Sequence, residues 1–125
     1  MSRRPRGAKR RARRFGLRAE TLAAWMLRLR GCHIEGRRVR TPVGEIDIVV
    51  RRGTVVAMVE VKGRADLALA AESIVRRQRA RIERAAEAFL RSRPALPELD
   101  LRFDVILVRP WRPPVHLVDA WRPGD

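Results

Sequence analysis

Several features are scarce or missing in this sequence, and each absence excludes a class of protein. Cys32 is the single cysteine among 125 residues, so no internal disulfide can form, which argues against a secreted domain held by disulfides. No apolar run approaches the roughly 18 to 20 residues that a membrane-spanning helix needs, and the N-terminus lacks the apolar core of a signal peptide. We therefore expect a cytoplasmic protein without a membrane segment.

Acidic residues are scarce relative to basic ones. The chain carries 29 lysine and arginine residues against 14 aspartate and glutamate residues, which gives a formal net charge of +15. Hydrophobic residues make up 46% of the chain, which is enough for a core, so the chain is not wholly disordered. The combination predicts a small, strongly basic domain whose partner is a polyanion, of which nucleic acid is the commonest.

Lysine is the rarer of the two basic residues. Lys9 and Lys62 are the only lysines, and all other basic residues are arginines. Arginine is a planar fork that stays charged, whereas lysine is a compact point charge that can exchange protons. A lysine retained in the folded part of such a chain indicates a specific role, which singles out Lys62.

The positive charge is concentrated at the N-terminus, where residues 3–14 contain no acid. The basic residues of this stretch are Arg3, Arg4, Arg6, Lys9, Arg10, Arg11, Arg13 and Arg14. Because the stretch lacks apolar periodicity, we predict a flexible basic arm over residues 1–15 and a single domain over residues 16–125. Such an arm would bind phosphates, so its affinity would fall steeply with salt. The alternative is a solvated tail that only increases solubility.

The apolar pattern predicts an α/β fold with a mixed β-sheet flanked by helices. Helical spacing predicts helices over residues 16–30 and 69–91, the first ending at Gly31 and the second before Pro94. Strands are predicted over residues 32–40, 45–51, 54–62 and 101–108, with an optional edge strand over 115–120. The first three strands would form an antiparallel meander. The long helix would then return the chain for a strand parallel to the third.

The connection at residues 52–53 determines the predicted register of the second and third strands. With a two-residue turn there, Asp47 lies opposite Met58, and Glu45 lies opposite Glu60. Facing residues project to the same side, and the side repeats every second residue. One face would therefore carry Glu45, Asp47, Glu60 and Lys62.

Such a cluster of carboxylates needs a compensating cation. Like charges directly opposite each other are destabilising, and burial raises the cost. Lys62 would offset part of the charge, and a divalent ion held by carboxylate oxygens would offset more. Hard oxygen ligands suit Mg²⁺ or Mn²⁺, so one of these ions is the expected cofactor.

Asp47, followed on the next strand by Glu60-Val61-Lys62, resembles the active-site signature of the PD-(D/E)xK nuclease superfamily. The surrounding sequence closely resembles the YraN-like family of small bacterial proteins, which resemble restriction endonucleases and archaeal Holliday-junction resolvases in fold. The resemblance covers nearly everything after residue 15. It rests on the segments GEIDIVV (44–50), VEVKGR (59–64) and RFDVILV (102–108), on the spacing of Gly16, Glu20 and Gly31, and on Asp119-Ala-Trp near the C-terminus.

The resemblance implies a restriction-endonuclease-like fold and a metal-dependent endonuclease that hydrolyses phosphodiester bonds of DNA, in particular branched or damaged DNA. Asp47 and Glu60 would bind the metal, with the Val61 carbonyl as a third ligand. Lys62 would hold the nucleophilic water or offset the charge that develops on the phosphate. Glu20 matches a glutamate on the first helix that joins the site in resolvase-like relatives. The alternative for Glu20 is an ordinary exposed helix residue.

Gln78 departs from the pattern of the family, which usually has a lysine on the long helix. Helical spacing places Gln78 on the inward stripe of residues 69–91, and some nuclease branches use glutamine there. The alternative is a hydrogen-bonded glutamine at the edge of the stripe. Gln78 therefore keeps a second function open, a non-catalytic nucleic-acid-binding module with the same fold. A basic accessory protein of RNA or ribosomes is a third.

Other charged residues carry expectations about partners and structure. The expected nucleic-acid contacts are Arg10, Arg11, Arg13, Arg14 and Arg64. A homodimer would suit symmetric cutting of branched DNA. Arg102 and Asp104 alternate on their strand, so we expect a structural ion pair there rather than a metal ligand. His116 has no neighbour at metal-ligand spacing, which favours a structural or exposed position.

Overall fold

The structure is a computed structural model that describes residues 6–63 and 76–124, with side chains described from Arg18 onward. Two α-helices, five strands and a short 3₁₀ helix follow one another in these ranges. In chain order they are α1 (Arg6–Leu29), β1 (His33–Thr41), β2 (Gly44–Arg52), β3 (Val55–Gly63), α3 (Arg76–Arg91), η1 (Leu96–Glu98), β4 (Asp100–Val108) and β5 (Val115–Trp121). None of the described helices is both long and apolar enough to cross a lipid bilayer.

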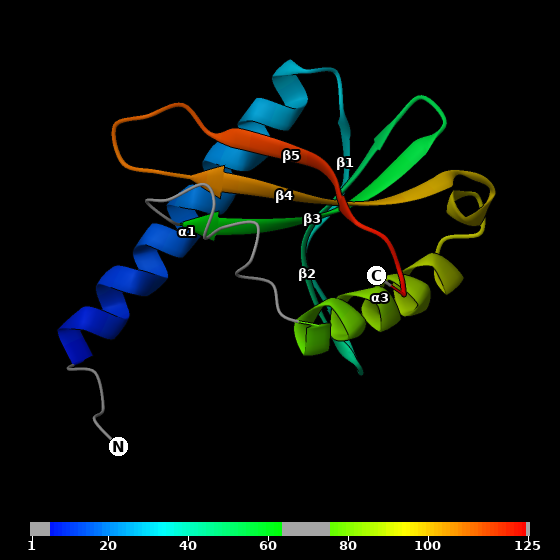
Figure 1. Ribbon diagram of the computed structural model, residues 1–125, viewed down its shortest axis with the longest axis horizontal. Coiled ribbons are helices and arrows are strands. Elements are labelled where there is room, and N and C mark those ends of the chain that lie inside the picture. Colours follow the sequence, from blue (N-terminus) through cyan, green and yellow to red (C-terminus); the bar gives the residue numbers. More distant parts are fainter. Residues whose placement is uncertain (1–5, 64–75, 125) are drawn as a thin grey trace.

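The strands form one mixed sheet in the order β1-β2-β3-β4-β5. β1, β2 and β3 pair antiparallel, β4 pairs parallel to β3, and β5 pairs antiparallel to β4. The predicted meander and the parallel return after the long helix are therefore confirmed, and so is the edge strand. The fold is α/β with two flanking helices, and it is consistent with a restriction-endonuclease-like fold (Figure 1).

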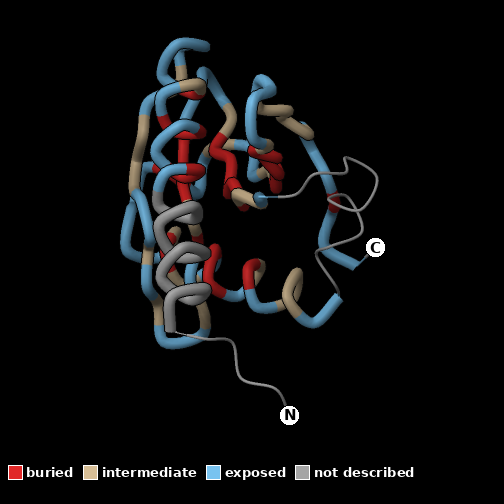
Figure 2. The backbone as a smooth tube through the Cα atoms, turned by 90° about the vertical axis from the view of Figure 1, so that its left-hand side faces the viewer, coloured by how far each residue is buried: buried red, intermediate tan, exposed pale blue. Residues whose placement is uncertain are grey.

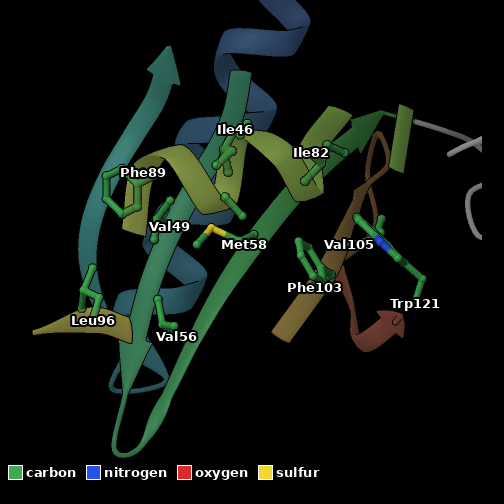
Figure 3. Packing of buried hydrophobic residues seen from close by; sticks show 12 residues of the cluster. Ile46, Val49, Val56, Met58, Ile82, Phe89, Leu96, Phe103, Val105 and Trp121 are labelled. Carbon is green, nitrogen blue, oxygen red and sulfur yellow. The ribbon is translucent and has the colours of Figure 1, made fainter. Parts of the chain in front are cut away.

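The two helices cover opposite faces of the sheet. On one face, α1 packs Ala23, Ala24 and Leu27 against Ile48 and other small or branched strand residues. On the other, α3 contributes Ile82 and Phe89 to a larger cluster (Figure 3). In this cluster Phe103 and Trp121 stack with their ring centroids 5.0 Å apart. Buried residues line the sheet and the inner sides of both helices (Figure 2). The sheet is therefore covered on both faces, which explains the nearly continuous apolar run of β3.

The first helix begins earlier than its apolar pattern predicts. It starts at Arg6 rather than at residue 16, so most of the predicted arm continues the helix. Residues 6–14 are mostly arginine, lysine and alanine, which have high helix propensity, and propensity needs no apolar stripe. The helix ends as predicted: Gly31 has φ +85° and the Cys32 N–H donates to the Leu27 carbonyl at 3.0 Å.

Other parts of the sequence-based predictions fall outside the described residues. These are residues 1–5 of the predicted arm and residues 69–75 of the predicted long helix. The division into an arm and a single domain stays a prediction. The described part of the long helix ends at Arg91, ahead of Pro94 as predicted.

The predicted β2–β3 register is wrong, because the hairpin turn lies one residue later in the chain than predicted. Val49, not Asp47, lies opposite Met58, because the turn consists of Gly53 and Thr54 instead of Arg52 and Gly53. Gly53 has φ +59°, and glycine in the first of two turn positions is what a type II′ hairpin turn requires. Each β2 residue therefore faces a β3 residue two positions further along than predicted. A shift of two residues does not by itself move a side chain to the other face of the sheet, and it brings Asp47 level with Glu60.

β2 changes face at Asp47. Ile46 packs in the cluster under α3, whereas Ile48 packs in the cluster under α1. Strict alternation would place both isoleucines on one face, so the alternation is broken between them. The printed β1–β2 pairs omit Asp47 and its expected partner Arg38, which has φ +47°. The start of β2 is held against α3 by Gly44, where a Cβ atom would lie 3.2 Å from the Arg81 carbonyl oxygen. The break in alternation lies at Asp47, within the candidate site.

Candidate active site

The β2–β3 ladder ends just before the candidate residues. Its last pair is Ile48 with Val59, and beyond it the Val61 N–H donates to Asp47 Oδ2 at 2.8 Å. The Asp47 side chain thus takes the place of a strand partner. The N–H and C=O of one residue point to the same side of an antiparallel strand. The Val61 carbonyl therefore faces the same gap between the strands as the Asp47 carboxylate.

The carboxyl groups of Asp47 and Glu60 lie close enough to affect each other's pKa. Burial is the largest effect on both groups and raises both pKa values. The nearby Asp47 charge also raises the pKa of Glu60, which reaches about 9. A carboxyl with this pKa is neutral at pH 7 and can donate its proton to the Asp47 carboxylate.

The carboxyl pair is incompletely satisfied. Glu60 is 5% exposed, and its Oε1 is buried with no hydrogen-bond partner. A buried polar atom without a partner costs about 1–3 kcal/mol, so most native structures avoid one. An orphaned carboxylate oxygen beside a second carboxylate is the donor set that a hard divalent cation needs. The residues present therefore fit Mg²⁺ or Mn²⁺.

Lys62 lies on β3 two residues beyond Glu60 and is half-buried. Its positive charge lowers the pKa values of both Asp47 and Glu60, although less than burial raises them. The ammonium group is thus close enough to both carboxyls to act on them. The structure thus brings Asp47, Glu60 and Lys62 to one region at the end of β3, and their role as a catalytic site stays a prediction.

Glu20 reaches the same region from α1 and is buried rather than exposed. Its charge raises the pKa of Asp47, so the two carboxylates are close. Both of its oxygens are engaged: Oε1 lies 3.2 Å from Arg37 Nε, and Oε2 lies 3.1 Å from Arg38 Nε. Glu20 anchors α1 to β1, and its role in the reaction stays a prediction.

Sequence reasoning missed the two arginines that hold Glu20. Neighbouring strand residues project to opposite faces, so Arg37 and Arg38 would not be expected to grip one carboxylate. Arg38 adopts φ +47°, a left-handed conformation that is rare outside glycine, and β1 carries a bulge between Ile34 and Gly36. Gly36 was the one visible signal of this irregularity.

The remaining predicted residues lie elsewhere or outside the description. Glu45 does not face Glu60; it is half-exposed and lies 3.8 Å from Arg40. Gln78 is half-buried on α3, one turn before the buried Ile82, as its spacing predicts. Arg64 falls outside the described residues, and so do the side chains of Arg10, Arg11, Arg13 and Arg14.

Among the described side chains, no group of three or more His, Cys, Asp and Glu residues is placed to hold a metal ion. A site built on Asp47 and Glu60 would therefore take its third protein ligand from the backbone. The Val61 carbonyl is the candidate.

Asp104 confirms the expected ion pair. It is fully buried, and Arg102 donates to both of its oxygens, at 2.8 and 2.9 Å. His116 Nε2 lies 2.7 Å from Asp104 Oδ2, and the Asp119 N–H donates to Oδ1 at 2.9 Å. Burial raises the pKa of Asp104, but these hydrogen bonds outweigh it and hold the pKa below the ordinary value.

Comparison with known proteins identifies relatives along almost the whole chain. The model of the family described as "Uncharacterised protein family UPF0102" matches residues 19–108. A UPF0102 protein of Parvibaculum lavamentivorans is 56% identical over 112 residues, which cover 90% of this chain and 84% of the relative. A UPF0102 protein of Paramagnetospirillum magneticum is 52% identical, with 89% of each chain covered. One of Rhizorhabdus wittichii is 48% identical over 88% of this chain and 92% of its own.

Proposed function

The chain belongs to the UPF0102 family, which is the YraN-like family, and we propose that it is a metal-dependent endonuclease that hydrolyses phosphodiester bonds of DNA. The observation that carries the proposal is the Asp47–Glu60 pair, in which Asp47 is half-buried and Glu60 is buried with an orphaned oxygen. A structural carboxylate in the same sheet, Asp104, has every oxygen satisfied. The unsatisfied pair is therefore best explained by a cation that it binds during function.

Asp47 and Glu60 would hold Mg²⁺ or Mn²⁺ with their carboxylate oxygens, and the Val61 carbonyl would complete the protein ligands. The bound ion would polarise the scissile phosphate and make a water molecule more nucleophilic. Asp47 is kept in position by the hydrogen bond from the Val61 N–H. Glu60 would release its proton to solvent on binding the ion, because a ligating carboxylate is ionised.

Lys62 holds its ammonium group beside the two carboxyls, where it would orient the attacking water or stabilise negative charge on the phosphate oxygens. Glu20 would assist from α1 while Arg37 and Arg38 keep its carboxylate in place. Gln78 would contact the substrate from α3. Around this site the net charge of +15 draws in the DNA backbone, with Arg10, Arg11, Arg13, Arg14 and Arg64 as the proposed contacts.

The decisive experiment is a cleavage assay on supercoiled DNA and a four-way junction, with Mg²⁺ or Mn²⁺ titrated in and EDTA as the blank. Asp47→Asn and Glu60→Gln should each lower the rate about a thousandfold, because several kcal/mol of charge stabilisation is lost. Glu45→Gln is the matched control: it removes a carboxylate from the same strand at a half-exposed position paired with Arg40, and cleavage should continue.

The absence of metal-dependent cutting by the wild-type protein would refute the proposal, and so would full activity of Asp47→Asn. Sedimentation with and without the junction measures the proposed homodimer, which would place two sites on a symmetric substrate. Localisation to the cytoplasm remains part of the proposal.

A second function is favoured by the surroundings of Glu20 and by the residue at position 78. Both oxygens of Glu20 are bound by arginines, and Gln78 stands where the family usually has lysine, so the site has fewer free charged groups than an active nuclease would use. The chain would then be a non-catalytic nucleic-acid-binding module. Calorimetry decides between the two: Mn²⁺ binding that Glu60→Gln abolishes supports the nuclease, whereas salt-sensitive DNA binding without Mn²⁺ binding supports the module. An RNA competitor in the same assay tests the RNA-accessory alternative.

A further inference from the structure

A basic pocket of about 520 Å³ lies at the other end of β3 from the carboxyl pair. Its floor and rim come from the end of α1, the β2–β3 turn, β4 and β5. The polar residues that line it are Arg30, Cys32, Arg52, Thr54, Arg102 and His116. Val55 opens β3 at this pocket, and Lys62 lies about 20 Å further along the strand, by the rise per residue of a β-strand. In Figure 1 the arrow of β3 points away from the β2–β3 turn, so the two sites are well separated.

The charges in this pocket do not cancel. Arg30, Arg52 and Arg102 line it, and no acidic side chain is among its lining residues in the described part of the chain. Arg102 is neutralised by the buried Asp104 behind it. Within the described residues, neither Arg30 nor Arg52 lies within ion-pair distance of a carboxylate. Two positive charges therefore face the pocket without compensation.

His116 fixes one of these arginines in place. Arg30 Nη1 lies 3.3 Å from His116 Nδ1, and because arginine can only donate, Nδ1 accepts. Nε2 then carries the proton and donates it to Asp104 Oδ2 at 2.7 Å. The chain from Asp104 through His116 to Arg30 holds the guanidinium at the rim of the pocket.

Neighbouring groups leave the pocket open to an anion. The carbonyls at the end of α1, which would repel one, accept hydrogen bonds from the N–H groups of Arg30, Gly31 and Cys32. Burial and, less strongly, the charge of Asp104 raise the pKa of the Cys32 thiol, while the charges of Arg52, Arg102 and Arg30 each lower it. The exposed Thr54 adds a hydroxyl that can donate.

We propose that this pocket binds a phosphate monoester group. Its two uncompensated charges match the charge of about −1.5 to −2 that a phosphate monoester carries at pH 7, whereas a carboxylate or a phosphodiester carries only one. Guanidinium groups match phosphate oxygens in geometry. The phosphate is either the terminal phosphate of a nucleic acid strand or a free phosphorylated small molecule. The pocket contains no part of the carboxyl pair, so the inference does not depend on the nuclease activity.

The test follows the backbone amide signals of Cys32, Gly53 and Thr54 by NMR while inorganic phosphate is titrated in the presence of EDTA. Chloride at equal ionic strength is the blank. In the wild-type protein we expect saturable shifts at these amides. Arg30→Gln combined with Arg52→Gln should weaken phosphate binding at least about tenfold, because two charge-assisted contacts are lost. The matched control is Arg81→Gln combined with Arg84→Gln, which removes the same charge from exposed positions on α3 and should leave binding unchanged.

Two oligonucleotides of one sequence distinguish the sources of the phosphate. Tighter binding of the 5′-phosphorylated strand than of the 5′-hydroxyl strand, lost in the Arg30 and Arg52 variant, assigns a nucleic acid end. Equal binding of the two strands, with saturable inorganic phosphate binding, assigns a small molecule. The proposal is overturned if the wild-type amides show no saturable shift, or if both double variants lose binding equally. EDTA excludes divalent ions, so these outcomes are separate from failure of the cleavage assay.

Discussion

Asp104 and Glu60 are both buried acids on central strands of one sheet, and their surroundings differ. Asp104 lies beside Val59, one position before Glu60, yet three partners donate to it and hold its pKa below the ordinary value. Glu60 has one carboxyl neighbour and an oxygen without a partner, and its pKa rises to about 9. Burial raises the pKa of both acids, so the opposite net shifts come from the hydrogen-bond donors around Asp104 and from the Asp47 charge beside Glu60.

Asp104 and Glu60 illustrate two kinds of buried acid, one that supports the fold and one that we propose has a function. A buried carboxylate whose oxygens all accept hydrogen bonds stabilises the sheet without a bound cation. The donors around the Asp47–Glu60 pair, among them the Val61 N–H, leave one Glu60 oxygen without a partner, and that oxygen is costly unless a cation binds it. We therefore expect substitutions at the two places to have opposite effects on stability.

The largest expected effect is at the satisfied site. Asp104→Ala should lower the free energy of unfolding by about 3 kcal/mol, because Arg102, His116 and the Asp119 N–H all lose their acceptor. Urea denaturation measures this loss. Asp100→Ala, an exposed acid on the same strand, is the control and should stay close to wild type. A small effect of Asp104→Ala would mean that the two sites do not differ as described.

Metal binding should stabilise the unsatisfied site only. Mn²⁺ at about one hundred times its dissociation constant should add about 2.7 kcal/mol to the free energy of unfolding. Asp47→Asn and Glu60→Gln should remove this gain, whereas Asp104→Ala should keep it from a lower starting point. Thermal unfolding with Mn²⁺ and then with EDTA measures the difference. An equal gain in all variants would place the ion elsewhere.

The pH dependence of the metal-free protein should show both sites with opposite sign. The pKa of Glu60 is about 9 in the folded state against an ordinary 4.5, so between these values the unfolded chain has lost a proton that the folded protein keeps. The free energy of unfolding therefore falls as pH rises through this window, by at most about 1.4 kcal/mol per unit. Denaturation across the window should show a flatter profile for Glu60→Gln.

Asp104 contributes at the acidic end. Because its pKa is lowered in the folded state, its stabilisation is present above the ordinary value of 3.8 and is lost as pH falls below it. Glu60→Gln should leave this acidic limb unchanged. A wild-type profile that rises between neutral and alkaline pH would contradict the raised pKa of Glu60.

The smallest expected effect concerns the turn that sets the register. Gly53 has φ +59°, so Gly53→Ala should cost about 1 kcal/mol of backbone strain. Because the turn determines how Asp47 meets Glu60, and leaves the β4–β5 pairing untouched, Mn²⁺ binding should weaken while the Asp104 contacts persist. Thr54→Ala is the control in the same turn. Unchanged Mn²⁺ affinity in Gly53→Ala would show that the carboxyl pair tolerates a disturbed hairpin.

Much of the fold could be predicted from local pattern. Alternation and apolar runs located all five strands, because a covered sheet imposes its period on the sequence. The start of α1 could not be predicted from periodicity, since residues 6–14 form helix by propensity without an apolar stripe. The exact hairpin register was also missed, because Arg52-Gly53 and Gly53-Thr54 are both plausible turns until the preference of glycine for the first position decides.

The sequence indicated which residues form the candidate site, but it did not indicate their protonation or their hydrogen-bond partners. The order of Asp47, Glu60 and Lys62 along two neighbouring strands is a local property, so sequence alone determined that these three groups share one end of the sheet. Only the tertiary structure decided that Glu60 keeps a proton and an unpaired oxygen, that Glu20 is bound by Arg37 and Arg38, and that Asp104 is satisfied. Protonation and hydrogen-bond partners depend on burial and on donors from distant elements, and the spacing of residues along one strand predicts neither.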